Sequence, residues 1–152
     1  MITKLQEWLK SRFKDDEDSQ QPEPLHIAAA MLLLEVGRAD FETSEKEKDT
    51  MTVVLKSQFA LNDEQVVSLM EHTLSEQDEY TSAHPFIKLL NEGLERDEKQ
   101  LLMEGCWHVA LSDAVLDKYE EYSIRKIADW LYVSHSEFIR SKEIVKSQLG
   151  LN

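Results

Sequence analysis

Four carboxylates recur with matched spacing in two stretches of the chain, EVGRADFETSEKEKDTM at residues 35–51 and HVALSDAVLDKYEEYSI at residues 108–124. In each stretch an apolar run ends at a small residue followed by Asp, and a Glu comes seven residues after that Asp. Carboxylate oxygens are the ligands that calcium and magnesium take in proteins. We therefore consider a divalent-metal site formed by Asp40, Glu47, Asp113 and Glu120.

A structural role accounts for part of the same pattern. Ser44-x-x-Glu47 and Asp117-x-x-Glu120 are capping boxes, in which the first side chain accepts the amide of the third helical residue and the Glu reaches back. Carboxylates there also favour the positive end of a helix. Capping does not by itself require an Asp four residues before each cap, so both interpretations stay open.

The first stretch is not an EF-hand, although Asp40, Glu42 and Ser44 place oxygens at alternate positions. An EF-hand loop needs a Gly at its sixth position and a bidentate Glu at its twelfth. This chain has Glu45 and Met51 at those places. A metal site here would need ligands from both stretches.

Helices are predicted to position these residues, because the chain has only four Gly and three Pro and few β-branched runs. Apolar spacing and caps predict helices at residues 1–14, 25–38, from Ser44 to about 60, from Asn62 to about 77, 82–94, from Asp97 to about 111, from Asp117 to Tyr132, and from Ser134 onward. The fold class is all-α, a single-domain bundle of about seven or eight helices.

The N-terminal region divides into an amphipathic helix at residues 1–14 and an acidic linker at residues 15–24, DDEDSQQPEP. Pro24 suits the first turn of the next helix. The apolar stripe of residues 1–14 could pack on the core or lie on a membrane surface. Because the acidic run at residues 15–18 would oppose an anionic membrane, packing on the core is the favoured use.

The remaining chain contains a predicted internal repeat, whose unit is a buried helix, an Asp-bearing loop, a capped helix, a tight turn and a second capped helix. A shift of 73 residues pairs Asp40 with Asp113 and Glu47 with Glu120, and after a one-residue slip it pairs Asn62 with Ser134. The repeats span about 25–78 and 97–147. Two such units are expected to pack about a pseudo-twofold axis, since each alone leaves an apolar face uncovered.

Charge and composition restrict the partners. The formal charge of −13 disfavours nucleic acid, and it favours cations or a basic or membrane-embedded protein partner. The single Cys106 fits a reducing compartment. No apolar stretch is long enough for a transmembrane segment, and the amphipathic N-terminus does not have the continuous apolar centre of a signal peptide. A cytoplasmic location is the expectation.

Other constellations give no catalytic site. Glu35 and His108 occupy equivalent places in the two apolar helices, and we expect a buried pair, with Glu104 as another partner for His108. Only one Glu-x-x-His occurs, at Glu23 and His26, whereas a di-iron bundle needs two. Without a nucleotide-binding or zinc-protease motif, the prediction is a non-enzymatic protein.

The stretches LLLEVGRADFETSEKE and CWHVALSDAVLDKYEEYSIRKIADWLYVSHSEFIRSKEIV resemble the two halves of the TerB-like tellurite-resistance family over about residues 25–145. The residues that carry the second half are Trp107, Val109, Asp113, Glu120, Arg125, Ile127, Ala128, Ser134 and Phe138.

The resemblance implies an all-α fold with internal pseudo-symmetry, a stress-response context, and an acidic patch for a divalent cation such as calcium, magnesium or manganese. Its implied ligands are Asp40, Glu47, Asp113 and Glu120. The chain departs from the family pattern at Phe41 and Ala114, where Gly commonly follows each Asp. An acidic protein-interaction module, in which the motif acids are only helix caps, is the alternative.

Overall fold

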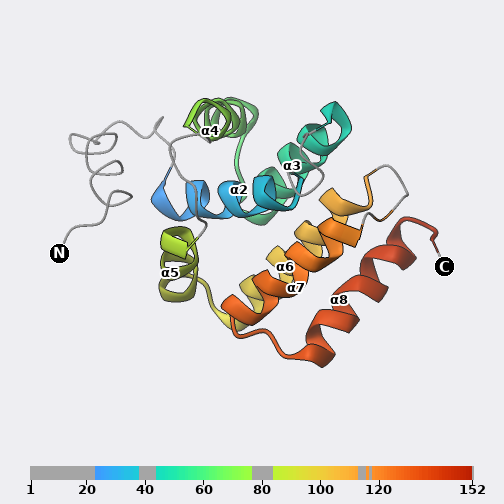
Figure 1. Cartoon of the computed structure of the whole chain (residues 1–152). Coiled ribbons are helices and arrows are strands. Elements are labelled where there is room, and N and C mark those ends of the chain that lie inside the picture. Colours follow the sequence, from blue (N-terminus) through green and yellow to red (C-terminus); the bar gives the residue numbers. More distant parts are fainter. Residues whose placement is uncertain (1–22, 38–43, 77–83, 113–115, 117, 152) are drawn as a thin grey trace.

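The computed structural model describes residues 23–37, 44–76, 84–112, 116 and 118–151, and within these ranges the chain is helical with no strand (Figure 1). The helices are α2 (Pro24–Gly37), α3 (Glu45–Gln58), α4 (Asp63–Glu76), α5 (His84–Gly93), α6 (Arg96–Ala110), α7 (Lys118–Trp130) and α8 (His135–Gln148). The prediction of an all-α bundle is confirmed. None of these helices is long and apolar enough to cross a lipid bilayer.

Local capping explains where several helices begin. The side chain of Ser44 accepts the amide of Glu47 at the start of α3. At α4 the Asn62 side chain accepts the amide of Gln65 at 2.8 Å, and the Gln65 side chain accepts the Asn62 amide at the same distance. Ser134 caps α8 as the sequence predicts. These bonds satisfy amides that a helix leaves without partners at its first turn.

The turns after α3 and α7 have the same geometry. Ala60 (φ 53°) and Tyr132 (φ 59°) are left-handed, a conformation that usually ends a helix. In each turn the next amide donates to the carbonyl five residues earlier, at 3.0 Å after α3 and 2.9 Å after α7. This bond is the Schellman type, which satisfies a terminal carbonyl and reverses the chain direction.

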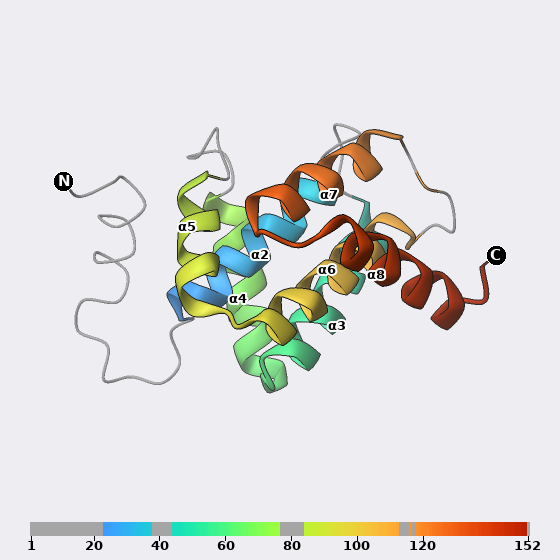
Figure 2. The ribbon, with the colours of Figure 1, turned by 90° about the horizontal axis from the view of Figure 1, so that it is seen from below.

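Helices α2 and α6 form the centre of the bundle. Helix α2 contacts α3, α4, α5, α6 and α7, and α6 contacts α3, α7 and α8 as well as α2 (Figures 1 and 2). Helix α2 is apolar around its whole circumference, with Ala28, Leu32, Leu33 and Val36 fully buried. Such a helix is stable only when neighbours surround it.

The two predicted units have matching contacts. Helix α2 packs on α3 and α4, and α6 packs on α7 and α8; across the units α2 touches α7 and α3 touches α6. A pseudo-twofold pair would give these contacts, while duplication of the sequence itself stays a prediction. Helix α6 begins at Arg96 and not at Asp97, one residue before the predicted start. Residues 1–14, predicted as a helix, and most of the predicted acidic linker lie outside the described ranges.

Candidate functional site

Glu47 is a buried carboxylate in the first turn of α3. Its side chain is only 3% exposed, although α3 is one of the most charged helices of the chain. One carboxylate oxygen accepts the Ser44 backbone amide at 2.8 Å, while the Glu47 amide donates to the Ser44 hydroxyl oxygen at 3.1 Å. The predicted capping box is therefore present, and it orients the Glu47 side chain toward the chain that precedes α3.

Glu120 is the corresponding buried carboxylate in the first turn of α7, with 4% of its surface exposed. Glu side chains are rarely buried to this degree unless a partner compensates the charge. Figures 1 and 2 both show the beginnings of α3 and α7 toward the end of α2 that lies away from α5. The sequence pattern located both residues, but it gave no sign that they would be buried.

The other two predicted ligands, Asp40 and Asp113, lie outside the described residues, as does the predicted cap Asp117. Glu47 and Glu120 are thus the described members of the predicted metal set. Within the described ranges no three His, Cys, Asp or Glu side chains gather closely enough to hold a metal ion. A cation at these helix starts would need oxygens from the segments that carry the two Asp residues.

The predicted buried pair of Glu35 and His108 does not form. Both side chains are only partly buried, and the His108 ring nitrogen Nε2 lies 2.9 Å from the side-chain oxygen of Gln148. Cys106, by contrast, is fully buried as expected. Burial raises the pKa of its thiol to about 12, so Cys106 is a core residue and not a nucleophile.

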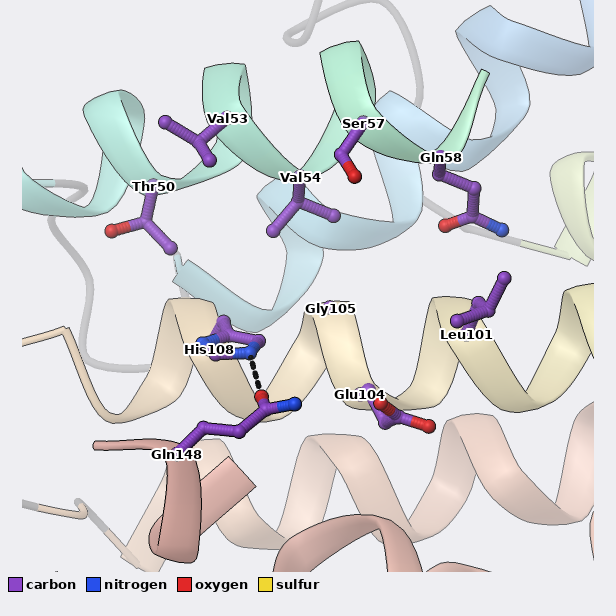
Figure 3. Close-up of a pocket in the computed structure, with 10 residues that line it drawn as sticks. All are labelled: Thr50, Val53, Val54, Ser57, Gln58, Leu101, Glu104, Gly105, His108 and Gln148. Atoms are coloured by element: carbon purple, nitrogen blue, oxygen red, sulfur yellow. Dashed lines mark hydrogen bonds between the residues drawn. The ribbon is translucent and has the colours of Figure 1, made fainter. Parts of the chain in front are cut away.

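Sequence reasoning missed a groove between α3 and α6, about 290 Å³ in volume, whose lining also includes Gln148 of α8 (Figure 3). Val54 and Gly105 line it where the two helices cross. Val53 and Leu101 also line it, yet 66% and 51% of their surfaces are exposed. Two adjacent valines in the otherwise charged sequence EKEKDTMTVVLKSQ are the signal that could have indicated it.

Glu104 is the acidic residue of this groove, and no Lys or Arg is among the ten residues that line it. Partial burial raises the pKa of the Glu104 carboxyl, while the nearby charges of His108 and Arg140 act in the opposite direction. The surface of the groove is therefore mainly apolar, with polar side chains along it and one partly buried acid on α6. Such a surface suits an apolar ligand that also carries positive charge.

Comparison with known proteins gives one family. The family model described as "Tellurite resistance protein TerB" matches residues 26–143, which covers all seven described helices except the ends of α2 and α8. No curated protein and no solved structure matches the chain.

Proposed function

The chain belongs to the TerB family of tellurite resistance proteins, and from this premise we propose that it binds a divalent cation through its duplicated acidic motif. The module would act by binding and not by catalysis. Asp40, Glu47, Asp113 and Glu120 supply the oxygen ligands in this proposal. Calcium, magnesium and manganese are the cations that such a ligand set suits.

The burial of Glu47 and Glu120 is the observation that carries this proposal. Withdrawing a carboxylate from water costs free energy unless hydrogen bonds or positive charge compensate it. One oxygen of Glu47 receives a backbone amide, which leaves the carboxylate with further acceptor capacity. A cation near the first turn of α3 would use this capacity of Glu47 and would add to the compensation of its negative charge.

Chain connectivity explains how the Asp residues could join them. Asp40 lies between the end of α2 and the start of α3, and Asp113 lies between α6 and α7. Each Asp is therefore within a few residues of the helix start that holds the corresponding Glu. Both connections start at the ends of the two central helices, α2 and α6, and these helices pack on each other. The proposal needs at least one Asp to approach a buried Glu.

Titration with calcium, magnesium or manganese, followed by amide NMR, tests the proposal. We expect shifts, or selective broadening with manganese, at the first turns of α3 and α7. The shifts should weaken in Glu47→Gln, which keeps a side-chain oxygen for the cap, and in Asp40→Asn/Asp113→Asn. Glu137→Gln is a matched control, because Glu137 is also the third residue of a capped helix but lies on α8. Unchanged spectra at millimolar metal would refute cation binding.

The complete capping box at Ser44 and Glu47 favours a second candidate, an acidic protein-interaction module whose motif acids only cap helices. Its partner would be a basic or membrane-embedded protein, attracted by the formal charge of −13. This candidate predicts a salt-sensitive complex that chelation of metal ions leaves intact. A complex that forms only with added metal would contradict it.

A further inference from the structure

The α3–α6 groove has an apolar surface that none of the described helices covers. Val53 and Leu101 are among the most exposed large apolar side chains of the described residues, and both line the groove (Figure 3). Leaving such side chains in water forgoes the stabilisation that burial of apolar surface gives. We propose that this groove is a docking site for a basic amphipathic helix, and that residues 1–14 of the same chain are its occupant.

The apolar pattern of residues 1–14 fits a groove between helices. Ile2, Leu5, Trp8 and Leu9 recur at intervals of three and four residues, so in a helix they share one face. Helices that bind grooves present their anchors with this spacing. A Trp with neighbouring Leu residues supplies the large apolar anchors typical of the centre of such a contact.

Charge favours the same pairing. Residues 1–14 carry Lys4, Lys10, Arg12 and Lys14 against one acid, Glu7, whereas the whole chain has 17 basic residues against 30 acidic ones. Glu104 supplies negative charge in the groove, and the groove lining has no Lys or Arg to repel the segment. A basic side chain beside Glu104 would add to the effect of Arg140 in stabilising a carboxylate that is partly withdrawn from water.

The connecting chain is long enough. The eight residues 15–22 separate the segment from Glu23, and extended chain spans at most roughly 26–29 Å over that number. Helix α2 starts at Pro24, has 14 residues, and is about 21 Å long. The His26 ring, three residues after Glu23, lies 4.3 Å from the Phe59 ring, and the preceding residue Gln58 lines the groove, so one end of the groove lies near the start of α2.

The test places a nitroxide spin label on Ser11→Cys in the full chain and records the loss of amide signals across the rest of the protein. Cys106 is fully buried, so labelling is selective for the new thiol. Ser11 is polar and lies outside the apolar stripe, which leaves the docking face unmodified. We expect the amides of Val53, Leu101 and Gly105 to lose most of their intensity.

Matched variants make the result specific. Val53→Lys should restore the lost signals, because it removes apolar surface and repels the basic segment, whereas Val67→Lys should not, because Val67 is a valine of α4 that is also more than half exposed but does not line the groove. Leu5→Asp/Leu9→Asp should restore them as well. Signal loss on another face, or none, would overturn the proposal. It would also fail if the loss appeared only between labelled and unlabelled chains in a mixture, or if the segment bound anionic vesicles and left the groove signals unchanged.

Discussion

The unit α2–α4 and the unit α6–α8 differ in the side chains that fill corresponding parts of their cores. The predicted duplication pairs three core residues of the first unit with three of the second, and all six are almost fully buried. The pairs are Leu34 with Trp107, Val66 with Phe138, and Leu69 with Ser141. The first set is aliphatic. In the second, the Trp107 indole N–H donates to the Ser141 hydroxyl at 3.0 Å, and the Trp107 and Phe138 ring centroids are 5.3 Å apart.

The difference shows that one helix arrangement tolerates two kinds of packing. Aliphatic contacts between α2 and α4 are non-directional, so they fix the distance between helices better than the register. The buried hydrogen bond between Trp107 and Ser141 adds a directional contact between α6 and α8. The second unit should therefore lose more stability when its central side chain is removed.

Truncation of the central side chain should give the largest effect. Trp107→Ala is expected to lower the free energy of unfolding by about 3–5 kcal/mol, and Leu34→Ala by a smaller amount within about 2–5 kcal/mol, because each leaves a cavity in a closely packed core. Urea unfolding followed by circular dichroism measures both. Equal losses would show that the larger ring and its hydrogen bond add nothing.

Ser141→Ala measures the contribution of the hydrogen bond separately from that of the Trp107 ring. It also provides a test of the second unit if Trp107→Ala does not fold. It leaves the buried Trp107 N–H without its partner, which should cost about 1–3 kcal/mol. Leu69→Val, a small apolar truncation at the corresponding place, should cost about 1 kcal/mol because it removes one methylene group.

The crossing of α3 over α6 should also differ from the crossing of α7 over α2. Gly105 lies at the first crossing, and a Cβ atom there would approach the Val54 Cγ1 atom to 2.6 Å. The corresponding residue of α2 is Leu32, which is fully buried. Gly105→Ala should lower stability by about 1 kcal/mol, since overpacking costs about 1–3 kcal/mol and alanine favours a helix by up to about 1 kcal/mol.

Removing the neighbour tests the cause. In a Val54→Ala background the clash disappears, so Gly105→Ala should become neutral or stabilising in urea unfolding. A cost that stays the same in both backgrounds would mean that Val54 is not the obstacle.

Local sequence was sufficient for the helices and insufficient for the groove. Ser44, Asn62 and Ser134 mark helix starts because a cap depends only on residues three positions apart. The groove depends on α3 crossing α6, which brings Val54 to Gly105 from 51 positions away. No local pattern encodes that contact. The Arg96 start of α6 was missed by one residue, as is usual for a helix end.

The metal hypothesis divides in the same way. The spacing located Glu47 and Glu120, and the cap at Ser44 explains the orientation of Glu47. Their burial depends on tertiary packing that the local spacing does not encode, and it was not predicted. The Glu35–His108 pair was wrong because equivalent positions about a pseudo-twofold need not face each other, and His108 instead meets Gln148 of α8.

The caps of α4 and α8 should show a smaller difference. Asn62 forms a reciprocal box with Gln65, whereas at α8 the Glu137 carboxylate contacts Arg96 and the Ser134 hydroxyl. Asn62→Ala and Ser134→Ala should each cost about 1 kcal/mol. Gln65→Ala should cost a further measurable amount because the Asn62 amide loses its partner, while Glu137→Ala should have almost no effect on thermal unfolding.

The smallest expected difference concerns one contact in each unit, between the first helix of the unit and the turn that joins its other two helices. The His26 ring lies 4.3 Å from the Phe59 ring, next to the turn after α3. The corresponding Lys99 donates to the Leu131 carbonyl at 3.1 Å, at the turn after α7. Burial lowers the pKa of His26 below its usual 6.5, with Glu23 opposing this shift. One contact thus depends on a neutral ring and the other on a charged amine.

The sign of the pH effect follows from that shift. The folded chain favours neutral His26, so this contribution to stability is present above about pH 6.5 and is lost as pH falls through the lower folded pKa. Urea midpoints between pH 5 and 7.5 should therefore decline toward acid in the wild type and decline less in His26→Gln. Lys99→Gln should keep the decline, since it leaves His26 and its surroundings unchanged. If the urea midpoint declined equally in the wild type and in His26→Gln, the acid sensitivity would come from carboxylates and not from His26. The contacts at the two turns would then not differ in their dependence on pH.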